Sequence, residues 1–119
     1  MTYKEVATMV GSIGVPFAYY QFPEGTAQAC PFICFYFTDS NDLAADNTNY
    51  QKIRPLSIEL YTDNKDFALE AQIEAALNNA GLVFTRSETY IGSERMYQIV
   101  YNTSVTIEDE IESEDNNNG

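Results

Sequence analysis

The sequence predicts an α+β fold: a two-layer sandwich with a mostly antiparallel sheet of about four to five strands and two helices. Two segments carry apolar residues at helical spacing on one side only, and further segments alternate or cluster apolar residues as strands do. The segments follow the order α-β-β-β-α-β-β, which favours helices packed on an antiparallel sheet. With 119 residues, 45% of them hydrophobic, the chain is long enough for one domain with its own core.

The first predicted helix lies at the N-terminus. Thr2 and Glu5 have the spacing of a capping box. Apolar residues then recur along one helical face: Val6, Met9, Val10 and Ile13. Gly14 and Pro16 are expected to end the helix.

Residues 17–22 and 31–38 are two aromatic-rich predicted strands with turn residues between them, and we expect them to form a hairpin. The second, PFICFYFT, is apolar on both faces, which is typical of a central strand covered on both sides. Within it Cys34 is interpreted as a small buried hydrophobe. A redox pair with Cys30 is disfavoured because the two thiols lack the C-x-x-C spacing.

After a polar connector at 39–49, residues 50–61 resume strand character. Leu56, Ile58 and Leu60 share one predicted face, and Ser57, Glu59 and Tyr61 share the other, half-solvated face. Pro55 indicates an edge position or a bulge at the start of this strand, because proline cannot donate to a sheet ladder.

The second predicted helix follows. Asp63 is the expected cap, with Asp66 in the first turn and Gly81 just past the end. Its apolar stripe consists of Leu69, Ile73, Ala76, Leu77 and Ala80. Glu70 and Glu74 are expected to face water.

Two last strands, 82–90 and 95–107, are predicted with a turn at Gly92-Ser93. The apolar pattern stops after Ile107. We therefore expect a single domain over 1–107 and an acidic disordered tail over 108–119.

The net charge of −12 is uneven: EDEIESED carries six carboxylates and no base, while the rest of the chain holds 12 acids and all 6 bases. This negative balance disfavours direct nucleic-acid binding, which needs Lys and Arg against phosphate. The N-terminus lacks the apolar region of a secretory signal, and no apolar run approaches the roughly 18 residues of a membrane helix. The expectation is a cytoplasmic origin and no membrane contact.

The sequence offers no catalytic site, no cofactor motif and no metal site. Histidine is absent, so serine nucleophiles lack their usual base, and the two cysteines cannot complete a zinc site. Carboxylates such as Asp42 lie in a turn-rich loop without the spacing of a calcium loop. We therefore predict a non-enzymatic protein that acts through surfaces. The predicted interface residues are Tyr19, Tyr20, Phe22, Asp39, Asp46 and Tyr50, since tyrosine is enriched at interfaces and polar loops are exposed.

Several strings carry a family resemblance: AYYQFPEG, PFICFYF, AADNTNYQKIRPLSIELYTDNKDFALEAQIEAAL and SETYIGSERMYQIVY. The chain resembles small prophage neck proteins of long-tailed phages of Gram-positive hosts, and specifically the tail terminator (tail completion) family. The resemblance implies an α+β fold and a hexameric ring that caps the tail tube. It also implies the major tail protein and the head–tail connector proteins as partners. The implied location of the protein is the virion neck and, during assembly, the host cytoplasm.

Two alternatives stay open. One is a head-completion (minor capsid) protein of the same phage neck, which has a similar size. The other is an acidic inhibitor that mimics DNA to block a host nuclease. That second role needs a patterned negative surface on the folded body, whereas much of the excess charge lies in the predicted tail.

The predicted tail gives a first test. A truncated chain ending at Glu108 should keep its melting temperature within a few degrees, because a disordered segment buries no core. Thermal unfolding followed by circular dichroism measures this. Loss of cooperative unfolding would show instead that residues 109–119 are part of the fold.

Overall fold

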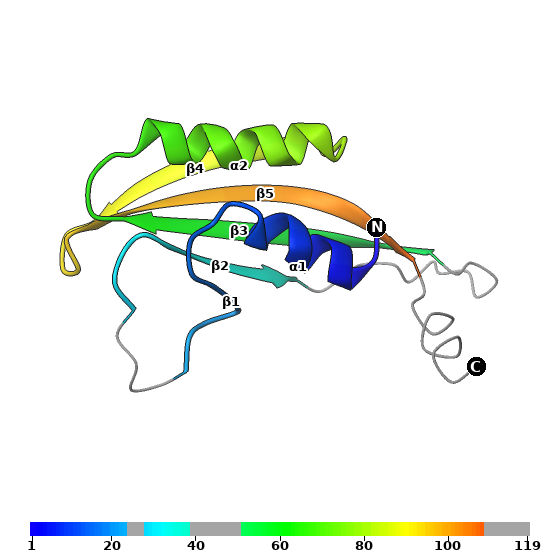
Figure 1. The fold of residues 1–119 in the computed structure, drawn as a ribbon, viewed down its shortest axis with the longest axis horizontal. Coiled ribbons are helices and arrows are strands. Elements are labelled where there is room, and N and C mark those ends of the chain that lie inside the picture. The colour runs from blue at the N-terminus through cyan, green and yellow to red at the C-terminus, as the bar shows by residue number, and fades with distance from the viewer. Residues whose placement is uncertain (24–27, 39–50, 109–119) are drawn as a thin grey trace.

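The computed structural model describes residues 1–23, 28–38 and 51–108 (Figure 1). The predicted α+β fold and element order are confirmed. Two helices and five strands follow one another as α1 (Tyr3–Gly11), β1 (Phe17–Tyr19), β2 (Phe32–Phe37), β3 (Gln51–Thr62), α2 (Phe67–Asn79), β4 (Phe84–Ile91) and β5 (Met96–Glu108). No helix in these described ranges is long and apolar enough to cross a membrane.

The five strands form one mixed sheet in the order β1-β2-β3-β5-β4. Three of the four pairings are antiparallel, but β1 pairs with β2 in parallel, so the expected hairpin is wrong. The chain turns away directly after β1: Tyr20 has a φ of 74°, and the Gln21 N–H donates to the Tyr19 carbonyl at 2.8 Å. The chain therefore leaves the sheet before β2 begins.

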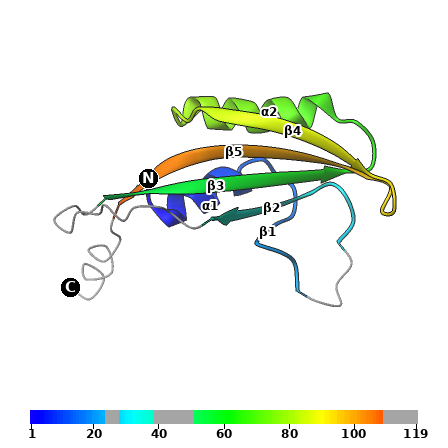
Figure 2. The ribbon, with the colours of Figure 1, turned by 180° about the vertical axis from the view of Figure 1, so that it is seen from behind.

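Both helices lie on one face of the sheet, in front of the strands in Figure 1 and behind them in Figure 2. We call this the covered face and the opposite one the open face. The expectation that β2 is covered on both sides is therefore only half right. Ile33 and Phe35 are buried under the helices, whereas Phe32 and Tyr36 on the open face are only partly buried and stack on other aromatic rings.

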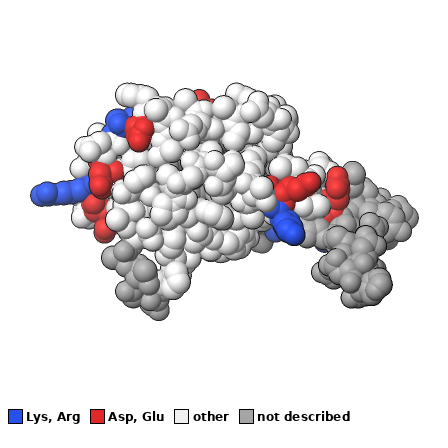
Figure 3. Space-filling model, in the orientation of Figure 1, with Lys and Arg blue, Asp and Glu red and all other residues white. Residues whose placement is uncertain are grey.

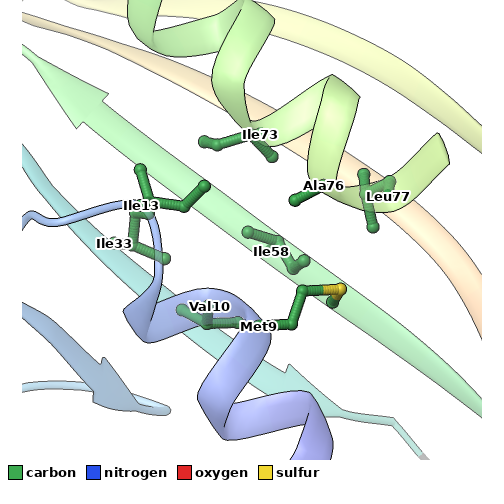
Figure 4. Close-up of a pocket in the computed structure, with 8 residues that line it drawn as sticks. All are labelled: Met9, Val10, Ile13, Ile33, Ile58, Ile73, Ala76 and Leu77. Carbon is green, nitrogen blue, oxygen red and sulfur yellow. The ribbon is translucent and has the colours of Figure 1, made fainter. Parts of the chain in front are cut away.

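The core lies between the covered face and the two helices. Figure 4 shows its centre, where α1 and α2 direct apolar side chains toward each other and toward β2 and β3: Met9, Val10, Ile13, Ile33, Ile58, Ile73, Ala76 and Leu77. The free space between them is about 10 Å³, which is room for about one water molecule. This region is a packed core and not a ligand site.

Hydrogen bonds hold the N-terminal segment in place, both at the start of α1 and at Met1. The predicted capping box is present: the Glu5 N–H donates to Thr2 Oγ1 at 3.1 Å, and the Thr2 N–H donates to Glu5 Oε1 at 2.9 Å. The Met1 ammonium donates to the Thr106 carbonyl at 2.9 Å, and the Glu108 N–H donates to the Met1 carbonyl at 3.0 Å. Met1 thus lies against the free edge at the end of β5.

Helix α2 begins one turn later than the sequence predicts. Asp66, and not Asp63, is the cap, and its carboxylate accepts from the Leu69 N–H at 3.0 Å. The end is as predicted. Gly81 has a φ of 76°, and the Leu82 N–H donates to the Leu77 carbonyl at 3.0 Å, as in a Schellman motif.

The predicted exposure of Glu70 and Glu74 is wrong. Glu70 is only 4% exposed and forms ion pairs with Lys65 and with Arg86, the latter at 2.6 Å. Glu74 accepts a hydrogen bond from the Tyr101 hydroxyl at 2.9 Å. Both glutamates lie beside the apolar stripe of α2. Arg86 lies in β4 and Tyr101 in β5, so the sequence of the helix could not reveal these contacts.

Pro55 lies in an interior strand, yet at the place where proline is tolerated. The last β2–β3 pair is Phe37↔Leu56, so Pro55 is one residue beyond the end of β2. Its carbonyl accepts from the Thr38 N–H at 3.1 Å, but proline cannot donate the reciprocal bond to the Thr38 carbonyl, and the β2–β3 ladder ends there. The predicted final turn also forms, between Ile91 and Met96.

These contacts predict three different responses within α2. Ile73→Ala should lower the free energy of unfolding by about 2–5 kcal/mol, because it opens a cavity in the core. Glu70→Ala should lower it by about 1–3 kcal/mol, because Arg86 and Lys65 lose a buried carboxylate. Gln72→Ala, an exposed change on the same helix, should stay within about 0.5 kcal/mol and serves as the control. Urea denaturation measures all three. A Glu70→Ala variant that unfolds with the same free energy as Gln72→Ala would contradict the ion-pair assignment.

Candidate interaction surface

Aromatic side chains gather where β1, the segment after it and the open face meet. We call this group the aromatic surface; it consists of Tyr19, Tyr20, Phe22, Phe32, Tyr36 and Tyr61. Tyr20 stacks on Tyr36 with ring centroids 5.1 Å apart. Phe32 stacks on Tyr61 at 4.8 Å and meets the edge of Phe22 at 5.5 Å. The rings thus hold one another in place across β2 and β3.

Two consecutive tyrosines link this surface to the edge of the sheet. The Tyr19 ring contacts Phe35 and Phe37 on the covered face, and its hydroxyl accepts from the Phe37 N–H at 3.1 Å. Tyr20 is 63% exposed and holds a positive φ, which costs a bulky residue about 1–2 kcal/mol. A strained, exposed aromatic residue is typical of a surface kept for recognition.

A carboxylate fixes the tyrosines of the open face. Glu59 accepts from the Tyr61 hydroxyl at 2.7 Å and from the Tyr36 hydroxyl at 3.0 Å. Gln98 then donates to the Tyr61 oxygen at 2.9 Å. Burial first, and then the hydrogen bond to Glu59, raise the pKa of Tyr61 above its ordinary value. Tyr61 is therefore a neutral phenol at physiological pH, which suits positioning and not nucleophilic chemistry.

Charged groups are sparse on two sides of the molecule. On the side drawn in Figure 3, Lys, Arg, Asp and Glu side chains gather near the two ends of the long axis, with a largely uncharged expanse between them. The strand register places no lysine or arginine of the strands on the open face. The side chains of Lys52, Arg54 and Arg86 all lie on the covered face, opposite residues of β5 that face the helices. Depletion of charge together with exposed tyrosines is the composition of an interface core.

The predicted interface residues stay a prediction, and the structure shows only where some of them lie. It brings Tyr19, Tyr20 and Phe22 together in one place, and whether they bind a partner stays a prediction. Asp39, Asp46 and Tyr50 lie outside the described residues. The set missed Tyr36 and Tyr61, although strand alternation already put Tyr61 on a half-solvated face.

The two thiols are poor candidates for chemistry. Burial first, and then Asp63, raise the pKa of the Cys30 thiol, and burial followed by Glu59 raises that of Cys34. A raised pKa leaves little reactive thiolate at neutral pH. Within residues 1–23, 28–38 and 51–108, no three Cys, Asp or Glu side chains cluster so that they could hold a metal ion.

The fold is shared with a chain of known structure. That chain belongs to the virion of a native gene transfer agent particle and superposes with a TM-score of 0.53 at 18% sequence identity. The likeness covers 89% of this chain and 88% of the other. No protein-family model and no curated protein matches the sequence. At this identity the likeness shows a common fold over nearly the whole length of both chains.

The strain at Tyr20 allows a test that spares the fold. Tyr20→Gly should change the free energy of unfolding by less than about 1 kcal/mol, because relief of the positive φ offsets the lost stacking on Tyr36. Phe35→Ala, which empties a buried position against the Tyr19 ring on the covered face, should cost about 3–5 kcal/mol. Denaturant unfolding of the two variants measures this. A large loss in Tyr20→Gly would mean that Tyr20 supports the fold rather than presenting a surface.

Proposed function

We propose that the protein is a non-enzymatic structural component of a phage-like virion. The observation that carries this is the fold shared with a chain from the virion of a gene transfer agent, across 89% of this chain and 88% of the other. A likeness of that extent covers most of the chain, and not one common motif. The rigid aromatic surface supports a role in contact with other proteins.

Within that class we propose the tail terminator, which caps the tail tube and joins it to the head connector. The resemblance of the segments IELYTDNKD and ERMYQIVY to that family supports the assignment. In this role several copies, six by the resemblance, surround the axis of the tail through head-to-tail contacts that close into a ring. The partners are then other copies of the chain, the major tail protein and the head–tail connector proteins.

The head-completion role in the same neck is the second candidate, because the likeness to a virion chain supports it equally. The DNA-mimic role is weaker. Six of the 18 acidic residues lie in the segment EDEIESED, and the rest of the chain holds 12 acids and all 6 bases. Within the described part, Glu70, Glu74 and Glu88 are engaged by Lys65 and Arg86. These ion pairs reduce the negative charge that the described residues could use to imitate a phosphate backbone.

Deletion of the gene from the phage that carries it distinguishes these roles. Loss of a tail terminator should give DNA-filled heads without joined tails, together with tail tubes of irregular and often excessive length. Electron microscopy of the lysate measures both. A complementing copy with Tyr20→Gly should restore fewer joined particles than the wild-type copy, if the aromatic surface makes the contact.

Other outcomes have definite meanings. Tails of normal length beside empty, leaking heads would overturn the tail terminator assignment in favour of head completion. Fully normal virions would overturn both structural roles and favour the inhibitor.

A further inference from the structure

Among the described residues, the sheet has one long free edge. Strand β4 runs over eight residues, pairs with β5 on one side only and ends the strand order, whereas the other edge strand, β1, has three residues. The central residues of β4 are exposed. An edge of this length presents a row of N–H and C=O groups that can accept another strand.

The sequence of β4 is chemically self-complementary about Ser87. Reading outward from it, Arg86 is matched by Glu88, Thr85 by Thr89, and Phe84 by Tyr90. When two antiparallel copies of such a strand lie side by side with Ser87 at the centre, each residue meets its chemical complement. Arg86 then lies opposite Glu88 of the second copy, twice by symmetry.

The hydrogen-bonding register of the sheet agrees with this centre. Thr106 and Glu108 bond to Met1, so the even-numbered residues of β5 direct their backbone groups away from β3 and toward β4. Their partners in β4 are odd-numbered, such as Ser87↔Val100. Since an antiparallel strand bonds its two neighbours through alternate residues, the groups that point outward from β4 belong to its even-numbered residues.

The even-numbered residues of β4, which direct their N–H and C=O groups outward, restrict how two β4 strands can pair. These groups form hydrogen bonds between the strands only if even-numbered residues lie opposite each other. Centring the pair on Arg86 would set Arg86 against Arg86, and centring it on Glu88 would set Glu88 against Glu88, which like-charge repulsion disfavours. Centring it on Ser87 bonds Arg86 to Glu88 of the second copy and Phe84 to Tyr90 of the second copy. Every outward residue of the strand is then paired.

We propose that the free protein forms a two-fold symmetric dimer by antiparallel pairing of β4 with β4 of a second copy, centred on Ser87. Within one copy Arg86 already contacts Glu88 at 2.9 Å and Glu70 at 2.6 Å, and Lys65 contacts Glu88 at 2.9 Å. The side chains of Arg86 and Glu88 are still about one-third exposed, so the pairing adds the opposite charges of the second copy to this network and sets no like charges against each other, which favours association despite the net charge of −12. The contact is isologous, so it closes on itself and removes an edge that would otherwise accept unrelated strands. This dimer concerns the protein in solution and does not depend on the proposed virion role.

Cysteine cross-linking tests the register. Ser87 and its symmetry mate form a non-hydrogen-bonded pair with Cα atoms about 4.5 Å apart, which is within disulfide reach. Under mild oxidation, the full chain with Ser87→Cys should become a disulfide-linked dimer on a non-reducing gel. Thr85→Cys is the matched control, because two copies of residue 85 lie about 13 Å apart in this register.

The two threonine positions give a second test of the same register. Thr85→Cys and Thr89→Cys should each stay largely uncross-linked alone, yet their mixture should form a heterodimer, because residue 85 faces residue 89 of the second copy. Cys30 and Cys34 are present in every variant, so they affect all samples alike. Cross-linking of Ser87→Cys no faster than that of Thr85→Cys would overturn the proposal.

Sedimentation velocity tests the association without cross-links. The unmodified protein should sediment as a dimer at tens of micromolar, and Glu88→Arg should weaken dimerisation at least about tenfold, because it sets arginine against Arg86 of the second copy. Glu94→Lys, a change of the same sign in the turn beyond β4, should leave the dimer intact. A monomeric wild-type protein, or a dimer that Glu88→Arg does not weaken while its circular dichroism stays native, would overturn the proposal.

Discussion

The pairing of β3 with β5 is the constraint on which the rest of the structure depends. The two strands pair along all 12 residues of β3, from Gln51↔Glu108 to Thr62↔Tyr97. Side chains alternate between faces, so a slip of one residue would move Leu56, Ile58 and Leu60 from the core to the open face. This register decides which side chains α1 and α2 can cover, and it also sets the parity of the hydrogen bonds at both edges of the sheet.

Covering one face only has two consequences. The open face must satisfy its own polar groups, and it does so by bonding Glu59 to the hydroxyls of Tyr36 and Tyr61. The helix layer must then be fixed from one side, and α2 is held both by its apolar stripe and by the contacts of Glu70 and Glu74 with Arg86 and Tyr101. Ion pairs this close to a core specify position, because a misplaced helix would leave a buried carboxylate unpaired.

The two candidate contact regions differ in physical character and suit different partners. The aromatic surface consists of rings that pack on one another, with the Glu59 carboxylate between Tyr36 and Tyr61, so it suits a different protein or a head-to-tail contact. The edge of β4 is polar and self-complementary, so it suits a second copy. A closed dimer cannot grow into a ring through the same edge. If the protein does cap a tail, the free dimer would keep its sheet edge paired until assembly supplies another contact.

Local signals in the sequence determined both helices, the five strands, the capping box at Thr2 and the Schellman end at Gly81, because each depends on residues within one turn of the chain. The sequence also picked out Tyr19, Tyr20 and Phe22, but not their contacts with Tyr36 and Phe32. Only the tertiary structure decided the parallel pairing of β1, the burial of Glu70 and the aromatic surface. Each of these needs a partner far away along the chain, and spacing within a segment says nothing about which distant residue will lie beside it.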